Sequence, residues 1–140
     1  MESSIPARTH PGPAPDLALK RILVVDDDEG TLRAIAALLS GEYDVVTASD
    51  GIEGLQAAIV HRPDLIIADV WMPRADGVTM VQRIKQIEPL RHTPVIFLTG
   101  QTSVHSMIAG ISAGARAYLS KPIDPDILER KVRSALARAR

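Results

Sequence analysis

The chain has 140 residues, of which 46% are hydrophobic and 24% charged, with a formal net charge of -1 and no cysteine. This length fits one domain with one sizeable core, and the near-neutral charge gives no electrostatic basis for binding nucleic acid or an anionic membrane. The lack of cysteine excludes disulfides and thiolate metal sites, and no apolar run approaches the roughly 20 residues that span a bilayer.

The N-terminal segment differs from the rest of the chain. Residues 1–18 contain four prolines among small and polar residues, so they cannot bury enough apolar surface to offset the entropy of ordering. We expect a disordered or extended tail there and one folded domain over residues 19–140. The first residues lack the basic and apolar regions of a signal peptide, which predicts a cytoplasmic protein.

Short apolar runs alternate with segments of helical periodicity along the predicted domain. The apolar runs predict five strands, at residues 22–25, 43–47, 64–69, 95–98 and 117–119. A helix is expected after each strand. Such strict alternation is typical of an α/β fold with a single doubly wound, five-stranded parallel sheet, flavodoxin-like strand order 2-1-3-4-5 and helices on both faces.

Helical spacing of apolar residues predicts the buried face of the first four helices. These faces are Leu32, Ile35, Ala36 and Leu39 in the first helix, Ile52, Leu55 and Ile59 in the second, Val78, Val81, Ile84 and Ile87 in the third, and Val104, Met107, Ile108 and Ile111 in the fourth. The last helix is predicted from Pro125 to about Ala139, with Asp124 as its cap.

Reactive side chains follow four of the predicted strands, and the carboxyl ends of parallel strands meet at one edge of a sheet. They are Asp26, Asp27 and Asp28 after the first strand, Asp69 at the end of the third, Thr99 after the fourth and Lys121 after the fifth. Crowded carboxylates require protonation or a cation, and a hard divalent ion such as Mg²⁺ suits an all-oxygen site. The alternative to a cation site is that these acids mark a helix N-terminus, where negative charge is favoured. A helix cap needs only one acid, so this alternative accounts for only one of Asp26, Asp27 and Asp28.

Thr99 and Lys121 add a hydroxyl and a positive charge, which are the groups that a phosphoryl group requires. Asp69 would then be the nucleophile, as carboxylates are in aspartyl-phosphate chemistry. A phosphatase of the haloacid dehalogenase type would need a second acid two residues after Asp69, where the sequence has Trp71.

Four motifs in order resemble the receiver domain of two-component response regulators, of the chemotaxis-receiver type. They are ILVVDD ending at Asp27, LIIADVWMP ending at Pro73 and followed by Asp76-Gly77, FLTG ending at Gly100, and GARAYLSKP ending at Pro122. Each motif alone is weak, but four on the expected elements are a strong signal. The resemblance runs from about Lys20 to Arg140.

The resemblance implies that Asp69 accepts a phosphoryl group from a sensor histidine kinase or a phosphotransfer protein, while Thr99 and Lys121 bind the phosphoryl oxygens. It also implies a Mg²⁺ (or Mn²⁺) ion held by Asp26, Asp27, Asp69 and the backbone carbonyl of Trp71. The domain would catalyse only its own phosphorylation and dephosphorylation, and would not otherwise be an enzyme.

The same resemblance implies that Tyr118 turns inward when Thr99 shifts toward the phosphate, and that the Lys121-Pro122 peptide bond is cis. The alternative for Tyr118 is a half-buried tyrosine of an edge strand. We further hypothesise that Trp71 and Gln101 set the lifetime of the phosphorylated form; the alternative for Trp71 is a surface aromatic in a partner contact.

The expected output of such a domain is a change in partner binding. A homodimer through the face formed by the fourth helix, the fifth strand and the fifth helix is a further expectation, with no binding of nucleic acid or membrane by this domain. The alternative function is a receiver-like interaction or dimerisation module that works without phosphorylation, and the complete set of acids, Thr99 and Lys121 argues against it.

Overall fold

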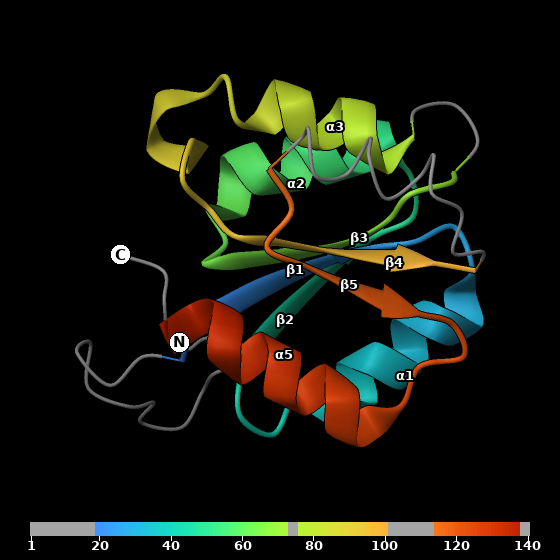
Figure 1. Cartoon of the computed structure of the whole chain (residues 1–140). Coiled ribbons are helices and arrows are strands. Elements are labelled where there is room, and N and C mark those ends of the chain that lie inside the picture. Colours follow the sequence, from blue (N-terminus) through green and yellow to red (C-terminus); the bar gives the residue numbers. More distant parts are fainter. Residues whose placement is uncertain (1–18, 73–75, 101–113, 138–140) are drawn as a thin grey trace, which may run out of the picture.

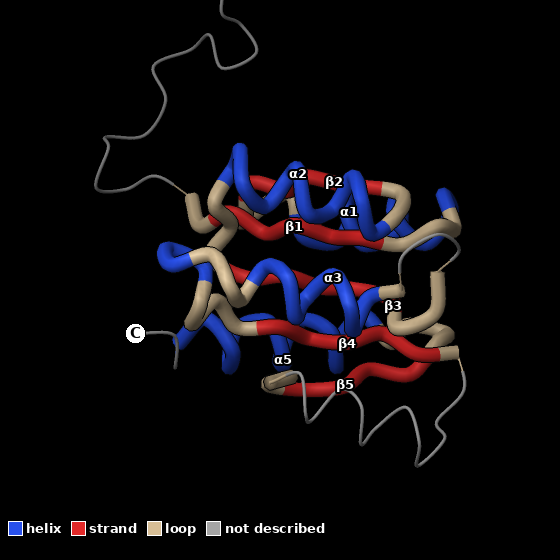
Figure 2. The backbone as a smooth tube through the Cα atoms, turned by 90° about the horizontal axis from the view of Figure 1, so that it is seen from above, coloured by secondary structure: helices blue, strands red, loops and turns tan. Residues whose placement is uncertain are grey.

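The computed structural model describes residues 19–72, 76–100 and 114–137, and the strands in these ranges form one parallel sheet (Figure 1). The strands are β1 (Arg21–Val25), β2 (Asp44–Ala48), β3 (Leu65–Asp69), β4 (Val95–Thr99) and β5 (Ala117–Ser120). Their order is β2-β1-β3-β4-β5, and Figure 2 shows this order from above the sheet. The predicted fold class and strand order are confirmed, with strand boundaries within one or two residues of the prediction.

Helices cover both faces of the sheet. α1 (Glu29–Leu39) and α5 (Pro125–Ala137) lie on one face, and α2 (Gly51–His61) and α3 (Gly77–Ile84) lie on the other (Figure 1). A short 3-10 helix, η2 (Glu88–Leu90), follows α3. The helix predicted over residues 104–111 and the tail predicted over residues 1–18 lie outside the described residues.

The two helical layers enclose two apolar clusters separated by the sheet. Ile35 of α1 and Leu128 of α5 are completely buried in one cluster, and Met80 and Ile84 of α3 are buried in the other. Every residue of β3 and β4 is buried, because strands at the centre of a parallel sheet are covered on both faces. This explains why these strands read as unbroken apolar runs.

The predicted buried face of α2 is wrong for Ile52 and Ile59, whereas Leu55 is partly buried and packs against the core. Ile52 and Ile59 are each 50% exposed, whereas Gly51, Gly54 and Ala58 face the core. A Cβ atom on Gly54 would lie 2.5 Å from the sulfur of Met80 and 3.1 Å from Val25. Small residues therefore let α2 pack closely against β1 and α3, and the spacing of the two isoleucines did not reveal this buried face.

An aspartate caps the N-terminus of each α-helix in the described ranges. The carboxylates of these residues accept hydrogen bonds from first-turn backbone N–H groups; the caps are Asp28, Asp50, Asp76 and Asp124. Such caps stabilise a helix by about 1 kcal/mol each. The predicted cap at Asp124 is confirmed, and Asp28, the third acid of the DDD sequence, caps α1.

The third helix is shorter than its apolar pattern predicted. α3 ends at Ile84, and Ile87 precedes the 3-10 helix η2, so Ile87 packs against the core from outside the helix.

No helix within the described ranges has the length and apolar character needed to cross a bilayer.

Candidate functional site

Three carboxylates meet at the carboxyl edge of the sheet. One oxygen each of Asp26, Asp27 and Asp69 lies within 4.8 Å of the others. The sheet brings them together because β1 and β3 are neighbours and Val25 pairs in register with Ala68, directly before Asp26 and Asp69. Asp26 is completely buried, Asp69 is 5% exposed and Asp27 is exposed. The predicted convergence of these acids is therefore present.

Asp26 is the most enclosed member of this cluster. Its Oδ1 accepts a hydrogen bond from the backbone N–H of Asp28 at 2.9 Å. Its buried Oδ2 has no hydrogen-bond partner among the described residues and lies 2.8 Å from Nζ of Lys121, an ion-pair contact. The Lys121 ammonium is therefore the counter-charge of this buried carboxylate.

Asp69 is held at the end of β3 by two donors. Its Oδ1 accepts the backbone N–H of Trp71 at 3.2 Å, and its Oδ2 accepts Nζ of Lys121 at 3.2 Å. Burial raises the pKa of Asp69 above its ordinary value, the Asp26 carboxylate raises it further, and Lys121 offsets only part of this rise. The site therefore disfavours a second negative charge unless a further cation or donor is supplied.

Lys121 is the positive member of the site. Its backbone N–H donates to the carbonyl of Thr99 at 2.9 Å, which fixes the residue after β5 beside the end of β4. Partial burial alone would lower the pKa of Lys121, but the carboxylates of Asp26 and Asp69 outweigh burial and raise it. The Lys121-Pro122 peptide bond is cis, as the resemblance implied.

Thr99 and Tyr118 lie on the neighbouring strands β4 and β5. Thr99 is 1% exposed and is the last residue of β4. Tyr118 is half-buried and pairs in register with Phe97, and the two ring centroids are 6.1 Å apart with 30° between the ring planes. Strand β4 carries both Thr99 and Phe97, and the ring of Phe97 packs against Tyr118. β4 therefore links the buried Thr99 to the packing of the tyrosine ring.

The site opens to solvent through a pocket of about 400 Å³ lined by Asp69, Trp71, Gly100 and Lys121. Trp71 is 59% exposed, so its indole stands at the mouth of the pocket. Gln101, the other residue predicted to tune dephosphorylation, lies outside the described residues. The pocket gives Asp69 and Lys121 access to a ligand from solution.

Gly77 supports the site in a way that the motif alone did not reveal. A Cβ atom on Gly77 would overlap the carbonyl oxygen of Asp69, and the Gly77 N–H donates to the carbonyl of Val70 at 3.1 Å. α3 therefore begins in direct contact with the backbone that carries Asp69. The sequence contained the residue, but the reason for glycine is a tertiary contact.

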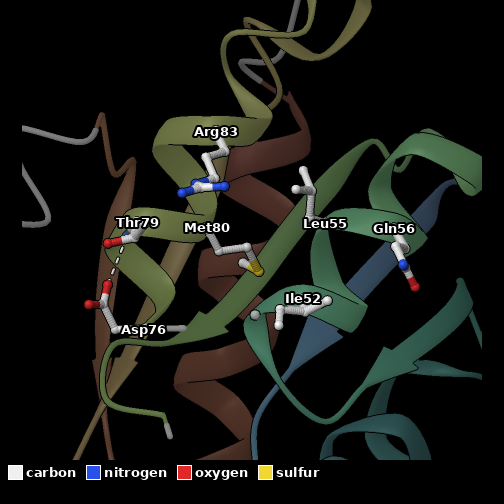
Figure 3. Close-up of a pocket in the computed structure, with 8 residues that line it drawn as sticks. Ile52, Leu55, Gln56, Asp76, Thr79, Met80 and Arg83 are labelled. Atoms are coloured by element: carbon white, nitrogen blue, oxygen red, sulfur yellow. Dashed lines mark hydrogen bonds between the residues drawn. The ribbon is translucent and has the colours of Figure 1, made fainter. Parts of the chain in front are cut away.

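A second pocket, of about 430 Å³, lies between α2 and α3 and is separate from this site (Figure 3). Ile52 and Leu55 line it from α2, and Met80 and Arg83 line it from α3. Its one acid, Asp76, serves as the cap of α3, because its Oδ1 accepts the backbone N–H of Thr79 at 2.8 Å. Asp69, Trp71 and Lys121, to which the sequence assigned the chemistry, line the edge pocket, and none of the predicted site residues in the described ranges lines this groove.

The donor set at the edge fits a hard divalent cation. Three carboxylates have oxygens within 4.8 Å of one another, and one of them, Asp26, is completely buried. Oxygen donors with open access to solvent are what Mg²⁺ prefers, since it retains several waters. Lys121 alone balances only one of these charges.

Comparison with known proteins agrees with this geometry. Residues 22–133 match the family model described as response regulator receiver domain. The chain is 43% identical over 115 residues to the response regulator PleD of Caulobacter vibrioides, covering 81% of this chain and 25% of PleD. It is 38% identical over 119 residues to the response regulator Rre1 of Synechocystis, covering 84% of this chain and 52% of Rre1.

Among solved structures, the chemotaxis protein CheY4 of Vibrio cholerae superposes with a TM-score of 0.81 at 33% identity, covering 85% of this chain and 100% of CheY4. The chain thus spans a quarter to about half of the two curated relatives named above, and the whole of the solved CheY4 chain. The family match, the strand order and the site residues agree, and we conclude that the chain belongs to the response regulator receiver domain family.

Proposed function

We propose that this receiver domain accepts a phosphoryl group on Asp69 from a phosphohistidine of a sensor histidine kinase or phosphotransfer protein, and that this changes its partner binding. The observation that carries the proposal is the contact of Lys121 with both Asp26 and Asp69 at the mouth of an open pocket. This arrangement offers a nucleophile, a positive charge and room for a phosphoryl group.

The proposed reaction transfers the phosphoryl group from an imidazole nitrogen of the donor to a carboxylate oxygen of Asp69. A carboxylate oxygen of Asp69 attacks phosphorus and forms an O–P bond, while the N–P bond of the donor breaks and its electron pair returns to the imidazole, which takes a proton from solvent. Lys121 pairs with the phosphoryl oxygens, and the hydroxyl of Thr99 donates a hydrogen bond to one of them. Positioning and charge neutralisation supply most of the catalysis in such transfers.

The carboxylates of Asp26, Asp27 and Asp69 and the backbone carbonyl of Trp71 would hold the divalent ion, Mg²⁺ or Mn²⁺. When bound, the ion neutralises charge on the carboxylates and the phosphoryl oxygens. The clustering of three carboxylates supports the proposal, since one oxygen each of Asp26, Asp27 and Asp69 lies within 4.8 Å of the others and Lys121 supplies only one positive charge to them.

The switch follows from what phosphorylation does to Thr99. A phosphoryl group on Asp69 provides a new acceptor for the Thr99 hydroxyl, and movement of Thr99 along β4 changes the space beside Phe97 and Tyr118. The ring contact between Phe97 and Tyr118 is the element whose packing we propose to change. Phosphorylation would in this way shift the population of the domain toward one of two existing conformations.

We also propose how the phosphorylated form is hydrolysed and which partners the domain binds. The domain acts as an enzyme only on its own phosphorylated aspartate, in the cytoplasm, with Trp71 and Gln101 adjusting the rate of hydrolysis. A homodimer through β5, α5 and the residues 104–111 is proposed as one output; the last of these lie outside the described residues. Neither nucleic acid nor membrane is proposed as a ligand of this domain.

The test is labelling by a small phosphodonor, such as acetyl phosphate, with Mg²⁺ and after chelation. We expect labelling of the wild type only with Mg²⁺, none in Asp69→Asn, and unchanged labelling in the matched control Asp28→Asn, whose carboxylate caps α1. Equal labelling of Asp69→Asn and wild type would refute the proposal. No labelling of any variant, with partner binding intact, would favour the module that works without phosphorylation.

A further inference from the structure

A second polar cavity, of about 360 Å³, lies at the opposite edge of the sheet from Asp69. It is formed where β4 and β5 begin, and the backbone N–H of Arg116 donates to the carbonyl of Val95 at 2.7 Å there. Four bases and no acid line this cavity; the bases are Lys85, Arg91, His92 and Arg116. The protein as a whole has a net charge of -1, so this concentration of positive charge is a local feature.

Lys85 is the innermost base of the cavity. Its ammonium donates to the carbonyls of Thr93 at 2.8 Å and Arg91 at 3.3 Å, and it forms no ion pair with a carboxylate in the described part of the chain. Burial lowers the pKa of Lys85, and the neighbouring positive charge of Arg116 lowers it further. Two carbonyl dipoles therefore hold an ammonium whose charge no acid of the described residues balances.

The two arginines are also available for a ligand. The guanidinium of Arg116 has neither a hydrogen bond nor an ion pair within the described ranges. Arg91 contacts Glu88 at 3.3 Å, but their side chains are 53% and 82% exposed, and exposed ion pairs contribute little. Between Glu88 and Asp124 the sequence contains no acidic residue, so the stretch of chain that carries Arg91 and Arg116 supplies no further counter-ion.

We propose that this cavity binds a small anion that carries phosphate groups, such as pyrophosphate or a nucleoside diphosphate. The ammonium of Lys85 and the two guanidinium groups match an anion with two or more negative charges, and guanidinium groups bind phosphate oxygens in pairs. The volume of about 360 Å³ lies within the range of small-molecule sites, which favours a small ligand over a protein surface. The site is separate from the phosphorylation site, because the two lie at opposite ends of β4 and β5.

The test is a titration of the full chain with pyrophosphate, followed by amide NMR shifts at constant ionic strength without Mg²⁺. We expect saturable shifts of residues around Arg91 and Arg116, and binding at least tenfold weaker in Arg116→Gln. Arg130→Gln, an exposed arginine of α5, is the matched control and should bind like the wild type. We select Arg116 because its side chain makes no contact of this kind with the described residues, whereas a Lys85 variant would lose two hydrogen bonds to backbone carbonyls.

A parallel titration with adenosine diphosphate identifies the ligand class. Affinity equal to that of pyrophosphate assigns recognition to the phosphates alone, and tighter binding adds a contact to the nucleoside. Shifts that do not saturate, equal weakening by Arg116→Gln and Arg130→Gln, or shifts confined to the edge around Asp69 and Lys121 would each overturn the inference. The last outcome would leave the proposed phosphorylation of Asp69 intact.

Discussion

The ammonium of Lys121 lies 2.8 Å from Oδ2 of Asp26, closer than its 3.2 Å contact with Oδ2 of Asp69. Lys121 is therefore the counter-ion of a completely buried carboxylate as well as a partner of the proposed phospho-acceptor. A phosphoryl group at Asp69 would compete with Asp26 for this charge. The stability of the domain and its chemistry are coupled through one side chain.

Loss of Lys121 should destabilise the fold. We expect Lys121→Met to reduce the free energy of unfolding by about 2 kcal/mol, less than the roughly 3–5 kcal/mol typical of a broken buried pair, since Lys121 is 24% exposed. Adding Asp26→Asn should recover most of this loss, because the uncompensated charge is then gone. Urea denaturation of both single variants and the double variant measures the coupling, with exposed Lys20→Met as control. Purely additive effects would show that the two residues do not interact.

Neutralising Asp69 should stabilise the domain when no divalent cation is present. The pKa of Asp69 is higher in the folded state than its ordinary value of 3.8, chiefly through burial and Asp26, so its ionised form opposes folding. The gain in stability from Asp69→Asn should be absent below the pKa of Asp69 in the unfolded state. It should grow as the pH rises from that pKa to the pKa in the folded state, and stay constant at higher pH. We expect a rise of roughly 4 °C in Tm at pH 7, measured by thermal denaturation in a chelator. A lower Tm for the variant at pH 7 would contradict this sign.

The contact between Gly77 and Asp69 predicts a strong effect of one added methyl group. Gly77→Ala places a Cβ atom on the Asp69 carbonyl oxygen, which should cost about 2 kcal/mol of stability and slow phosphorylation by displacing the acceptor. Gly41→Ala is the control, because no described atom lies within 4 Å of the place that its added methyl group would occupy. Equal stability of the two variants in urea denaturation would disprove the steric role of Gly77.

Trp71 should affect the lifetime of the phosphorylated form and not the stability of the fold. Its side chain is 59% exposed at the mouth of the pocket, so Trp71→Ala should change the free energy of unfolding by less than about 0.5 kcal/mol. We expect at least a threefold change in the rate of dephosphorylation, because we propose that the indole borders the path of the water that attacks the phosphorylated Asp69. The rate is followed by loss of radiolabel after removal of the donor. An unchanged rate would assign the indole to partner contact instead.

The corrected face of α2 can be tested by matched truncations. Ile35 is completely buried and Ile59 is 50% exposed, so Ile35→Ala should cost about 3 kcal/mol and Ile59→Ala less than about 1 kcal/mol. Urea denaturation of the two variants compares the same chemical change in two environments. A larger loss at Ile59 would return this residue to the core and reject the orientation of α2.

Part of the site was predictable from residue order. Asp26 and Asp69 follow apolar runs that read as buried strands, and alternating helices made a parallel sheet the only arrangement that covers both of its faces. Since ligands of such sheets bind at the carboxyl ends of the strands, the convergence of these acids with Lys121 was an inference from topology. Family resemblance, and not spacing, supplied the cis bond before Pro122 and the role of Tyr118.

Residue patterns alone were enough to predict the sheet, the edge that carries the acids, and the residues that follow each strand, because backbone hydrogen bonding and burial of apolar strands depend on local patterns. The folded chain was needed to show which face of α2 is buried, why position 77 must be glycine, and that the bases at Lys85, Arg91 and Arg116 share a cavity. These features depend on how closely elements distant in the chain approach one another, and side-chain volume at such contacts leaves no periodic signal in the sequence.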